Sequence, residues 1–187
     1  MKNLFATLFL LGCIGTVMAQ ESYFKVGINL NSWLNTSTNT NIVSPYTGFN
    51  ASYEKPFGSK FSMVYNLNYY RASSNAWTIT NVSFYPEVRF YPLKKQAPQF
   101  YRNQGVFFQF GVRAISYLDN KTGLSHFSEF SFSGVEGAGS YLGVGIKYPF
   151  SEKTGIEMHL NTSPYQLIMQ SHTLPLQAGF KFYWQLH

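Results

Sequence analysis

The sequence predicts an all-β protein, an eight-stranded antiparallel up-and-down transmembrane β-barrel. Three observations lead to this prediction. Apolar and polar residues alternate in eight segments of about ten residues each, as in strands with one apolar and one polar face. Aromatic residues make up 19% of the chain, whereas charged residues make up only 12%, about half of the usual ~25%. The chain also begins with a short apolar segment that is typical of exported proteins.

The first 19 residues are predicted to be a secretory signal peptide. Lys2 precedes an apolar run, and a small-residue cleavage motif ends at Ala19. The run of about 14 apolar residues is too short for a transmembrane helix, which needs ~20. A lipoprotein signal that ends at Cys13 is the alternative. We therefore expect two regions, a signal peptide at 1–19 and a single outer-membrane β-barrel domain at 20–187.

Cysteine content and charge exclude several classes of protein. Cys13 is the only cysteine, so the expected mature chain has no disulfide and no cysteine ligand for a metal. The net charge of +6 is a modest excess carried by scattered basic residues, and this does not favour nucleic-acid binding. The four histidines are spread along the chain. We therefore expect no cofactor and no metal.

Eight alternating segments follow the signal peptide. In order they span residues 23–31, 46–55, 60–71, 80–92, 106–117, 140–150, 154–162 and 174–186. Their apolar faces carry Phe24, Val26, Ile28 and Leu30; Phe49, Ala51 and Tyr53; Phe61, Met63, Tyr65, Leu67 and Tyr69; Val82, Phe84, Pro86, Val88 and Phe90; Phe108, Phe110, Val112 and Ala114; Leu142, Val144, Ile146 and Tyr148; Ile156, Met158 and Leu160; and Leu174, Leu176, Ala178, Phe180, Phe182, Trp184 and Leu186. No helical pattern lies between them, which indicates an all-β meander.

The connections between the segments alternate in character. Those after the second and sixth segments are tight turns with Pro and Gly or Ser. The connections after the first, third, fifth and seventh segments are mostly polar and vary in length. Short turns at one end and longer loops at the other are typical of outer-membrane barrels. The longest connection, which contains "SHFSEF", is predicted to be a surface loop.

Volume decides which face of each strand lies inside the barrel. The interior of an eight-stranded barrel barely holds ordinary side chains, so roughly five large residues per strand would not fit there. Small polar residues fit, and opposite charges can pair among them. The predicted lumen charge network consists of Lys25, Glu54, Glu87, Arg89, Arg113, Lys147, Glu157, His159 and Lys181. The excess of cations places some of them near the mouth, in contact with water.

The apolar faces are then expected to contact lipid. A closed barrel pairs every backbone N–H and C=O group in a medium without water. Tyr and Trp residues near the strand ends are predicted to form interfacial girdles. They are Trp33, Tyr46, Tyr69, Trp77, Tyr148 and Trp184.

Over residues 20–187 this pattern resembles the small eight-stranded outer-membrane barrels, the membrane domain of outer membrane protein A and its relatives. The resemblance is carried by the signal peptide, the eight strands, "VSFYPEVRFYP", "YLGVGIKYPF" and "GFKFYWQLH". It implies a location in the outer membrane of a Gram-negative bacterium, with both termini in the periplasm. Outer-membrane lipid and lipopolysaccharide are the implied surroundings of such a barrel.

In that family the last strand is also a signal for the barrel-assembly machinery. The residues implied here are Phe180, Phe182, Trp184 and Leu186. Family members usually end in Phe or another aromatic residue, whereas this chain continues from Leu186 to His187. The departure weakens the assembly signal without removing it.

The predicted function is non-enzymatic, a structural or surface-interaction role with a side-chain-plugged lumen and an undetermined surface ligand. One alternative is an enzyme that modifies lipid A or another lipid. The pair His126 and Ser128 is similar to the His-x-Ser pair of outer-membrane lipid A deacylases, although Glu129 and Phe130 follow where that family has Asn-Gly. A second alternative is a soluble ligand-binding barrel.

Overall fold

The computed structural model describes residues 22–35, 43–57, 60–73, 77–92, 105–122, 125–131, 140–163 and 173–186. The predicted signal peptide and His187 lie outside these ranges. The strands are β1 (Ser22–Asn35), β2 (Val43–Phe57), β3 (Phe61–Ser73), β4 (Trp77–Phe90), β5 (Gly105–Val112), β6 (Ile115–Thr122), β7 (Ser125–Ser131), β8 (Ser140–Pro149), β9 (Thr154–Thr162) and β10 (Thr173–Leu186). Within the described ranges, no helix is long and apolar enough to cross a membrane.

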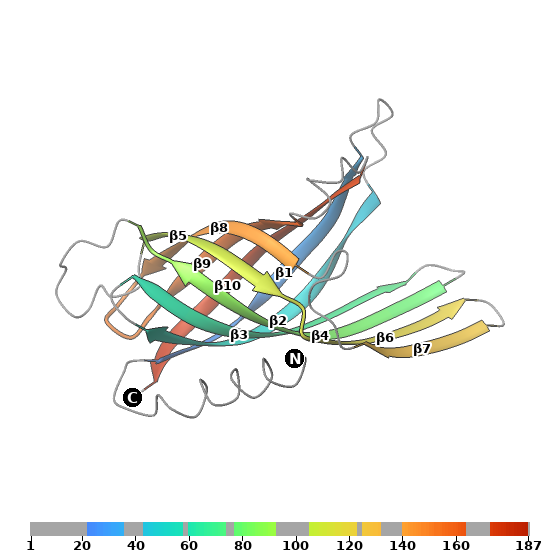
Figure 1. The fold of residues 1–187 in the computed structure, drawn as a ribbon, viewed down its shortest axis with the longest axis horizontal. Helices are drawn as coiled ribbons and strands as arrows, with labels where there is room; N and C mark the ends of the chain where they lie inside the picture. The colour runs from blue at the N-terminus through green and yellow to red at the C-terminus, as the bar shows by residue number, and fades with distance from the viewer. Residues whose placement is uncertain are drawn as a thin grey trace, which may run out of the picture.

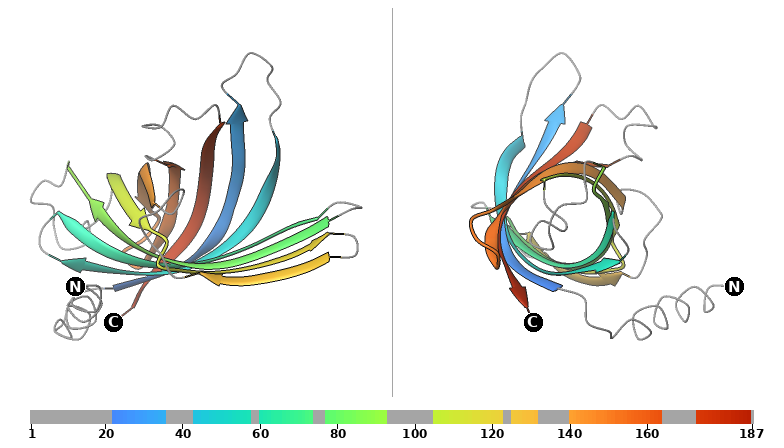
Figure 2. Two further views of the ribbon diagram at one scale, coloured as in Figure 1. Left: turned by 45° about the vertical axis from the view of Figure 1, so that its right-hand side comes forward. Right: turned by 90° about the vertical axis from the view of Figure 1, so that its left-hand side faces the viewer.

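Eight of the strands close into an antiparallel barrel. Their cyclic order is β1–β2–β3–β4–β5–β8–β9–β10, and β1 pairs with β10 from Ser22↔Leu186 to Asn35↔Thr173 (Figure 1). The right-hand view of Figure 2 looks along the barrel and shows the strands forming a ring. The predicted fold class, an eight-stranded antiparallel barrel, is confirmed. β10 pairs with β1 along its whole length, and this pairing closes the sheet.

The two ends of the barrel differ. We call the end that holds the start of β1 and the finish of β10 the terminal end, and the opposite one the distal end. The β8–β9 connection lies at the terminal end, and there the Ser151 hydroxyl accepts hydrogen bonds from the backbone N–H groups of Lys153 and Thr154 at 3.2 and 3.1 Å. The connections between β1 and β2 and between β9 and β10 lie at the distal end.

A β-bulge divides the fifth predicted segment into β5 and β6, both of which pair with β4. Along this ladder two β4 residues, Tyr85 and Pro86, face the three residues 112–114. Proline has no N–H to donate to a neighbouring strand and is found at edges or bulges for that reason. Its position on β4 explains why the ladder is interrupted there.

The segment "SHFSEF" is a strand, so the prediction of a surface loop there was wrong. β7 pairs with β6 from Ser116↔Ser131 to Thr122↔Ser125. This hairpin and the adjoining part of β4 project beyond the barrel at the distal end (Figure 1). The sequence pattern missed β7 because its two aromatic residues, Phe127 and Phe130, are three residues apart and so fall on opposite faces of a strand. The segment therefore shows no apolar face.

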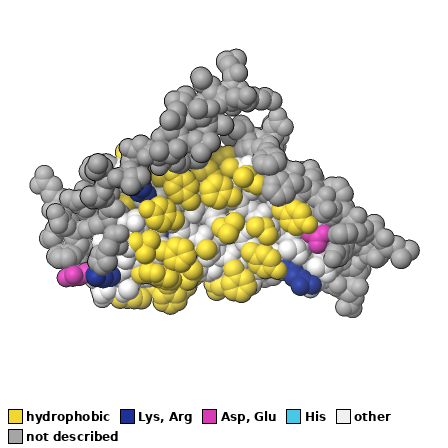
Figure 3. Space-filling model, turned by 90° about the horizontal axis from the view of Figure 1, so that it is seen from below, with side chains coloured by type: hydrophobic (Ala, Val, Ile, Leu, Met, Phe, Trp, Pro, Cys, Tyr) yellow, Lys and Arg dark blue, Asp and Glu magenta, His cyan; other side chains and the backbone are white. Residues whose placement is uncertain are grey.

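Burial follows the two predicted faces of the strands. Lys25 and Arg89 are fully buried, whereas Phe49 is 64% exposed and Val144 is 43% exposed. In Figure 3 apolar side chains cover the middle of the barrel exterior, and charged side chains appear only towards the two ends of that face. The interior is therefore polar and the exterior apolar. This is the reverse of a soluble ligand-binding barrel, whose apolar side chains line the inside.

Three of the predicted girdle residues can be placed. The side chains of Tyr69, Tyr148 and Trp184 are exposed on the exterior. The side chains of Trp33, Tyr46 and Trp77 lie outside the described part of the chain.

Candidate functional site

Three glutamates from different strands meet inside the terminal half of the barrel. Glu54 on β2, Glu87 on β4 and Glu157 on β9 are almost completely buried. The Lys25 Nζ atom lies 2.5 Å from one carboxylate oxygen of Glu54 and 2.5 Å from one of Glu157. The Lys147 Nζ atom donates to Glu54 at 3.1 Å. Each lysine therefore neutralises charge that would be costly to bury alone.

Arg89 connects two of these glutamates. Its Nη1 and Nη2 atoms donate to the two oxygens of Glu157 at 2.6 and 2.9 Å, and its Nε atom donates to Glu87. Two parallel hydrogen bonds between a guanidinium and a carboxylate are among the stronger polar interactions in proteins. Arg89 has the largest fully buried side chain of the described residues.

Neutral donors complete the carboxylate shells. Ser62 and Tyr91 donate to the same oxygen of Glu54 at 2.5 and 2.8 Å. Tyr141 and Asn66 donate to one oxygen of Glu87 at 2.5 and 3.1 Å. Sequence reasoning did not include these four residues. Three of them lie on strands and Tyr91 directly follows β4. A hydroxyl or amide that faces inward has many possible partners, so the sequence alone did not identify these contacts.

Aromatic side chains surround the cations of this cluster. The Lys147 Nζ atom lies 3.5 Å from the ring centre of Tyr23 and 4.4 Å from that of Tyr183. The Arg89 guanidinium carbon lies 4.3 Å from the ring centre of Phe107. Such contacts favour a cation in a site with little water. The ion pairs and these rings therefore lie together in the terminal half of the barrel.

The distal half of the lumen is rich in amides. Asn29 donates to Asn68 at 3.2 Å, and Asn50 donates to the same oxygen of Asn68. On the other side of the barrel, Asn161 accepts from Gln109 and donates to Gln177 at 2.9 Å. These contacts join neutral amides, whereas the contacts of the terminal half join ionised groups.

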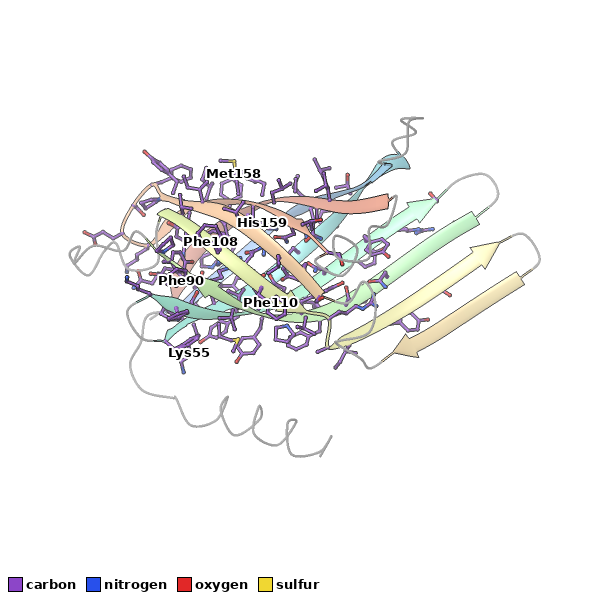
Figure 4. The ribbon with its side chains drawn as sticks, turned by 45° about the horizontal axis from the view of Figure 1, so that its top comes forward. Lys55, Phe90, Phe108, Phe110, Met158 and His159 are labelled. Carbon is purple, nitrogen blue, oxygen red and sulfur yellow. The ribbon has the colours of Figure 1, made fainter. Side chains whose placement is uncertain are left out.

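The remaining predicted network residues lie around the cluster. The Lys181 Nζ atom donates to Asn66 at 2.9 Å and to Ser52 at 3.5 Å. The His159 Nδ1 atom is 3.6 Å from Glu157. Figure 4 shows His159 and its neighbour Met158 on opposite sides of the β9 wall. Eight of the nine predicted lumen residues are buried, and Arg113 is half-buried.

The two residues of the predicted enzymatic alternative lie on β7. By backbone register Ser128 is the partner of Asp119, and His126 is the partner of Lys121, both on β6. The side chains of His126 and Ser128 are outside the described part of the chain. No group of three or more His, Cys, Asp or Glu that could hold a metal occurs among the residues that the structure describes.

The proposed assembly residues occupy the exterior face of β10. Phe182, Trp184 and Leu186 are exposed at 51%, 37% and 37%, and Phe180 is half-exposed. Their role in barrel assembly stays a prediction.

The closed antiparallel sheet, the polar lumen and the apolar exterior define the class of the fold, a small eight-stranded outer-membrane β-barrel. The chain belongs to the family described as "Protein of unknown function (DUF3575)", whose model matches residues 5–172. No curated protein sequence matches the chain.

Solved structures of bacterial proteins share this fold. The attachment invasion locus protein Ail of Yersinia pestis aligns with 12% identity and a TM-score of 0.56, over 90% of this chain and 100% of that chain. Ail in complex with the heparin analogue sucrose octasulfate gives a TM-score of 0.57 over the same shares, also at 12% identity. Neisserial surface protein A aligns with 12% identity and a TM-score of 0.52, over 88% of this chain and 97% of that chain. At this identity the similarity establishes the fold alone.

Proposed function

We propose that this protein is an integral outer-membrane barrel that serves a non-enzymatic, surface-interaction role through the free edge of β7. The apolar exterior and the polar interior support insertion in a bilayer, since only a closed barrel or a helix pairs all of its backbone groups there. The terminal end faces the periplasm and the distal end faces the surroundings of the cell, as the resemblance implies. The lumen is a filled structural core and not a channel.

The free edge of β7 is the observation that supports an interaction role. β7 stands at the end of the strand order, and within the described residues it pairs with β6 alone. An edge strand presents a row of backbone N–H and C=O groups that another extended chain can pair with. Many proteins bind extended peptides by adding them as a strand to such an edge. β7 has seven residues and no proline, so its edge is continuous.

A peptide with the sequence of β6, ISYLDNKT, is a suitable probe of the free edge. The opposite edge of β7 already pairs with that sequence in antiparallel register, so the sequence is compatible with pairing to β7. We expect the fluorescently labelled peptide to bind saturably to the barrel reconstituted in vesicles. The control is the same peptide with alternate backbone nitrogens methylated, which cannot donate to a strand. Equal binding of both peptides, or no saturable binding of either, would contradict the proposal.

The lipid-modifying alternative can be tested with the same barrel. Ser128 on β7 and Asp119 on β6 are backbone partners at the distal end. Serine, histidine and aspartate are residue types used together in nucleophilic catalysis, and His126 and Ser128 are two residues apart on β7. The Ser128→Ala variant separates the two functions. If β7 binds a peptide through its backbone, peptide binding is expected to persist in the variant. If the protein is a lipid-modifying enzyme, expression of the wild type alters the mass of lipid A and expression of the variant does not.

A filled lumen predicts that the protein conducts no ions. Arg89, Lys25, Lys147 and Glu157 fill the terminal half, and each is at most 1% exposed. In a planar bilayer we expect no stepwise conductance from the purified barrel, with a general porin as the positive control. Long-lived ohmic steps that scale with the amount of inserted protein would show that the lumen is open.

A further inference from the structure

Arg113 differs from every other cation of the predicted lumen network. Lys25, Arg89 and Lys147 each contact a carboxylate, and Lys181 donates to two neutral oxygens. The Nε atom of Arg113 is buried and has no hydrogen-bond acceptor among the described residues. Leaving a buried donor of a charged group unpaired is unfavourable, and such a group in a native structure calls for an explanation.

The backbone places Arg113 at an irregular position of the wall. It is the middle residue of the bulge between β5 and β6, opposite Tyr85 and Pro86 of β4. The ladder resumes directly after it, where the N–H of Ala114 donates to the carbonyl of Phe84 at 2.9 Å. Bulges commonly redirect one side chain and occur next to functional sites. Arg113, the residue with the unpaired donor, is the middle residue of this bulge.

The charge balance of the lumen favours an anion near Arg113. The buried residues Lys25, Arg89, Lys147 and Lys181 already outnumber the three glutamates, and Arg113 adds a further positive charge. The glutamates are engaged in the terminal half, and the region around Arg113 holds Tyr70, which is close enough to interact with its charge. Arg113 is half-buried, so ions from solution can reach it. A guanidinium is well suited to carboxylate, phosphate or sulfate groups.

We infer that Arg113 is an anion-binding residue, and that the distal half of the lumen binds one carboxylate, phosphate or sulfate group of a ligand from outside the barrel. The group accepts hydrogen bonds from the guanidinium, including its Nε–H, and compensates the surplus positive charge. The site is separate from the β7 edge and does not depend on the surface-interaction role. A phosphate group can come from a lipid headgroup or from solution, and the binding chemistry is the same.

The Nε–H signals of the arginines in a ¹⁵N-labelled sample test this inference directly. The barrel is placed in nanodiscs of zwitterionic lipid and titrated with sodium sulfate, sodium phosphate and sodium acetate at constant ionic strength. We expect the Arg113 signal to shift and saturate with at least one of these anions. The Arg89 signal should stay in place, because its Nε–H already donates to Glu87. A second sample, in nanodiscs with an anionic lipid, distinguishes a lipid phosphate from an anion in solution. A lipid phosphate shifts the Arg113 signal without added salt.

Matched variants separate a specific site from general screening. Arg113→Gln is expected to weaken the apparent affinity, followed through backbone amides of the bulge, by about tenfold or more. Arg71→Gln removes the same charge from an exposed position on β3 and should leave the affinity unchanged. If Arg113→Gln does not fold, Arg113→Lys keeps the charge and still removes the Nε–H donor. Linear, unsaturated shifts of all arginine signals, or an unchanged affinity in both Arg113 variants, would overturn the inference.

Discussion

Glu157→Gln is expected to lower the free energy of unfolding by about 3–5 kcal/mol, the usual cost of removing one member of a buried ion network. Glu157 accepts two hydrogen bonds from Arg89, forms an ion pair with Lys25 and is fully buried. The neutral amide leaves both cations without their shared carboxylate.

The measurement is a urea titration of the reconstituted barrel, followed by the different gel mobilities of its folded and unfolded forms. Glu152→Gln is the matched control, since Glu152 is exposed in the connection between β8 and β9, and we expect a change of at most ~1 kcal/mol there. A double variant that also carries Lys25→Met should recover part of the loss, because the excess of buried positive charge left by the loss of Glu157 is then smaller. Equal small effects of Glu157→Gln and Glu152→Gln would contradict the buried network.

Val144→Arg is expected to destabilise the barrel by about 2–4 kcal/mol, the cost of a basic residue at the lipid-facing middle of an outer-membrane strand. Val144 is 43% exposed on the exterior of β8, between the equally exposed Leu142 and Ile146. In a bilayer this position meets hydrocarbon, which cannot solvate a guanidinium. On a protein surface that faces water, the same substitution would cost little because water solvates the charge.

Tyr148→Arg serves as the control for this prediction. Tyr148 lies on the same face of β8 near its end and is 59% exposed. Because it falls at the predicted interface, the expected loss is about 0–1 kcal/mol. Both variants are measured by the same titration in lipid vesicles. A loss at Val144 no larger than the loss at Tyr148 would mean that this face does not contact the hydrocarbon core.

The closure of the barrel, and which face of each strand lies inside it, could be predicted because both follow from a property of single strands. Alternation identifies the two faces of each segment, and the volume of an eight-stranded interior decides which face is inside. The pairing inside the lumen could not be predicted in the same way. Arg89 is the ladder partner of Gln109 on β5, yet both of its Nη atoms donate to Glu157 on β9. Such contacts depend on the stagger of the strands, which alternation does not specify.

Two local features show where the pattern was insufficient. Pro86 in the fourth segment was available as a sign of an irregular ladder, and it lies opposite the bulge at Arg113. β7 was missed because its stability comes from pairing with β6 and not from an apolar face of its own. Sequence periodicity detects strands that have one apolar and one polar face. It does not detect strands that are stabilised mainly by pairing with a neighbouring strand.

The most direct test of the orientation of the strands uses single cysteines that carry a nitroxide label. The chain has one cysteine, Cys13, which falls in the predicted signal peptide, so labels can be introduced one at a time in the mature barrel. Oxygen collides frequently with a label in lipid, and a water-soluble nickel chelate does not reach it. We expect high oxygen and low nickel accessibility at Val144 and Met158, and low oxygen accessibility at Gln109 and Asn161. Oxygen accessibility that is equal at both pairs, or higher at Gln109 and Asn161, would show that the apolar faces do not lie in the bilayer.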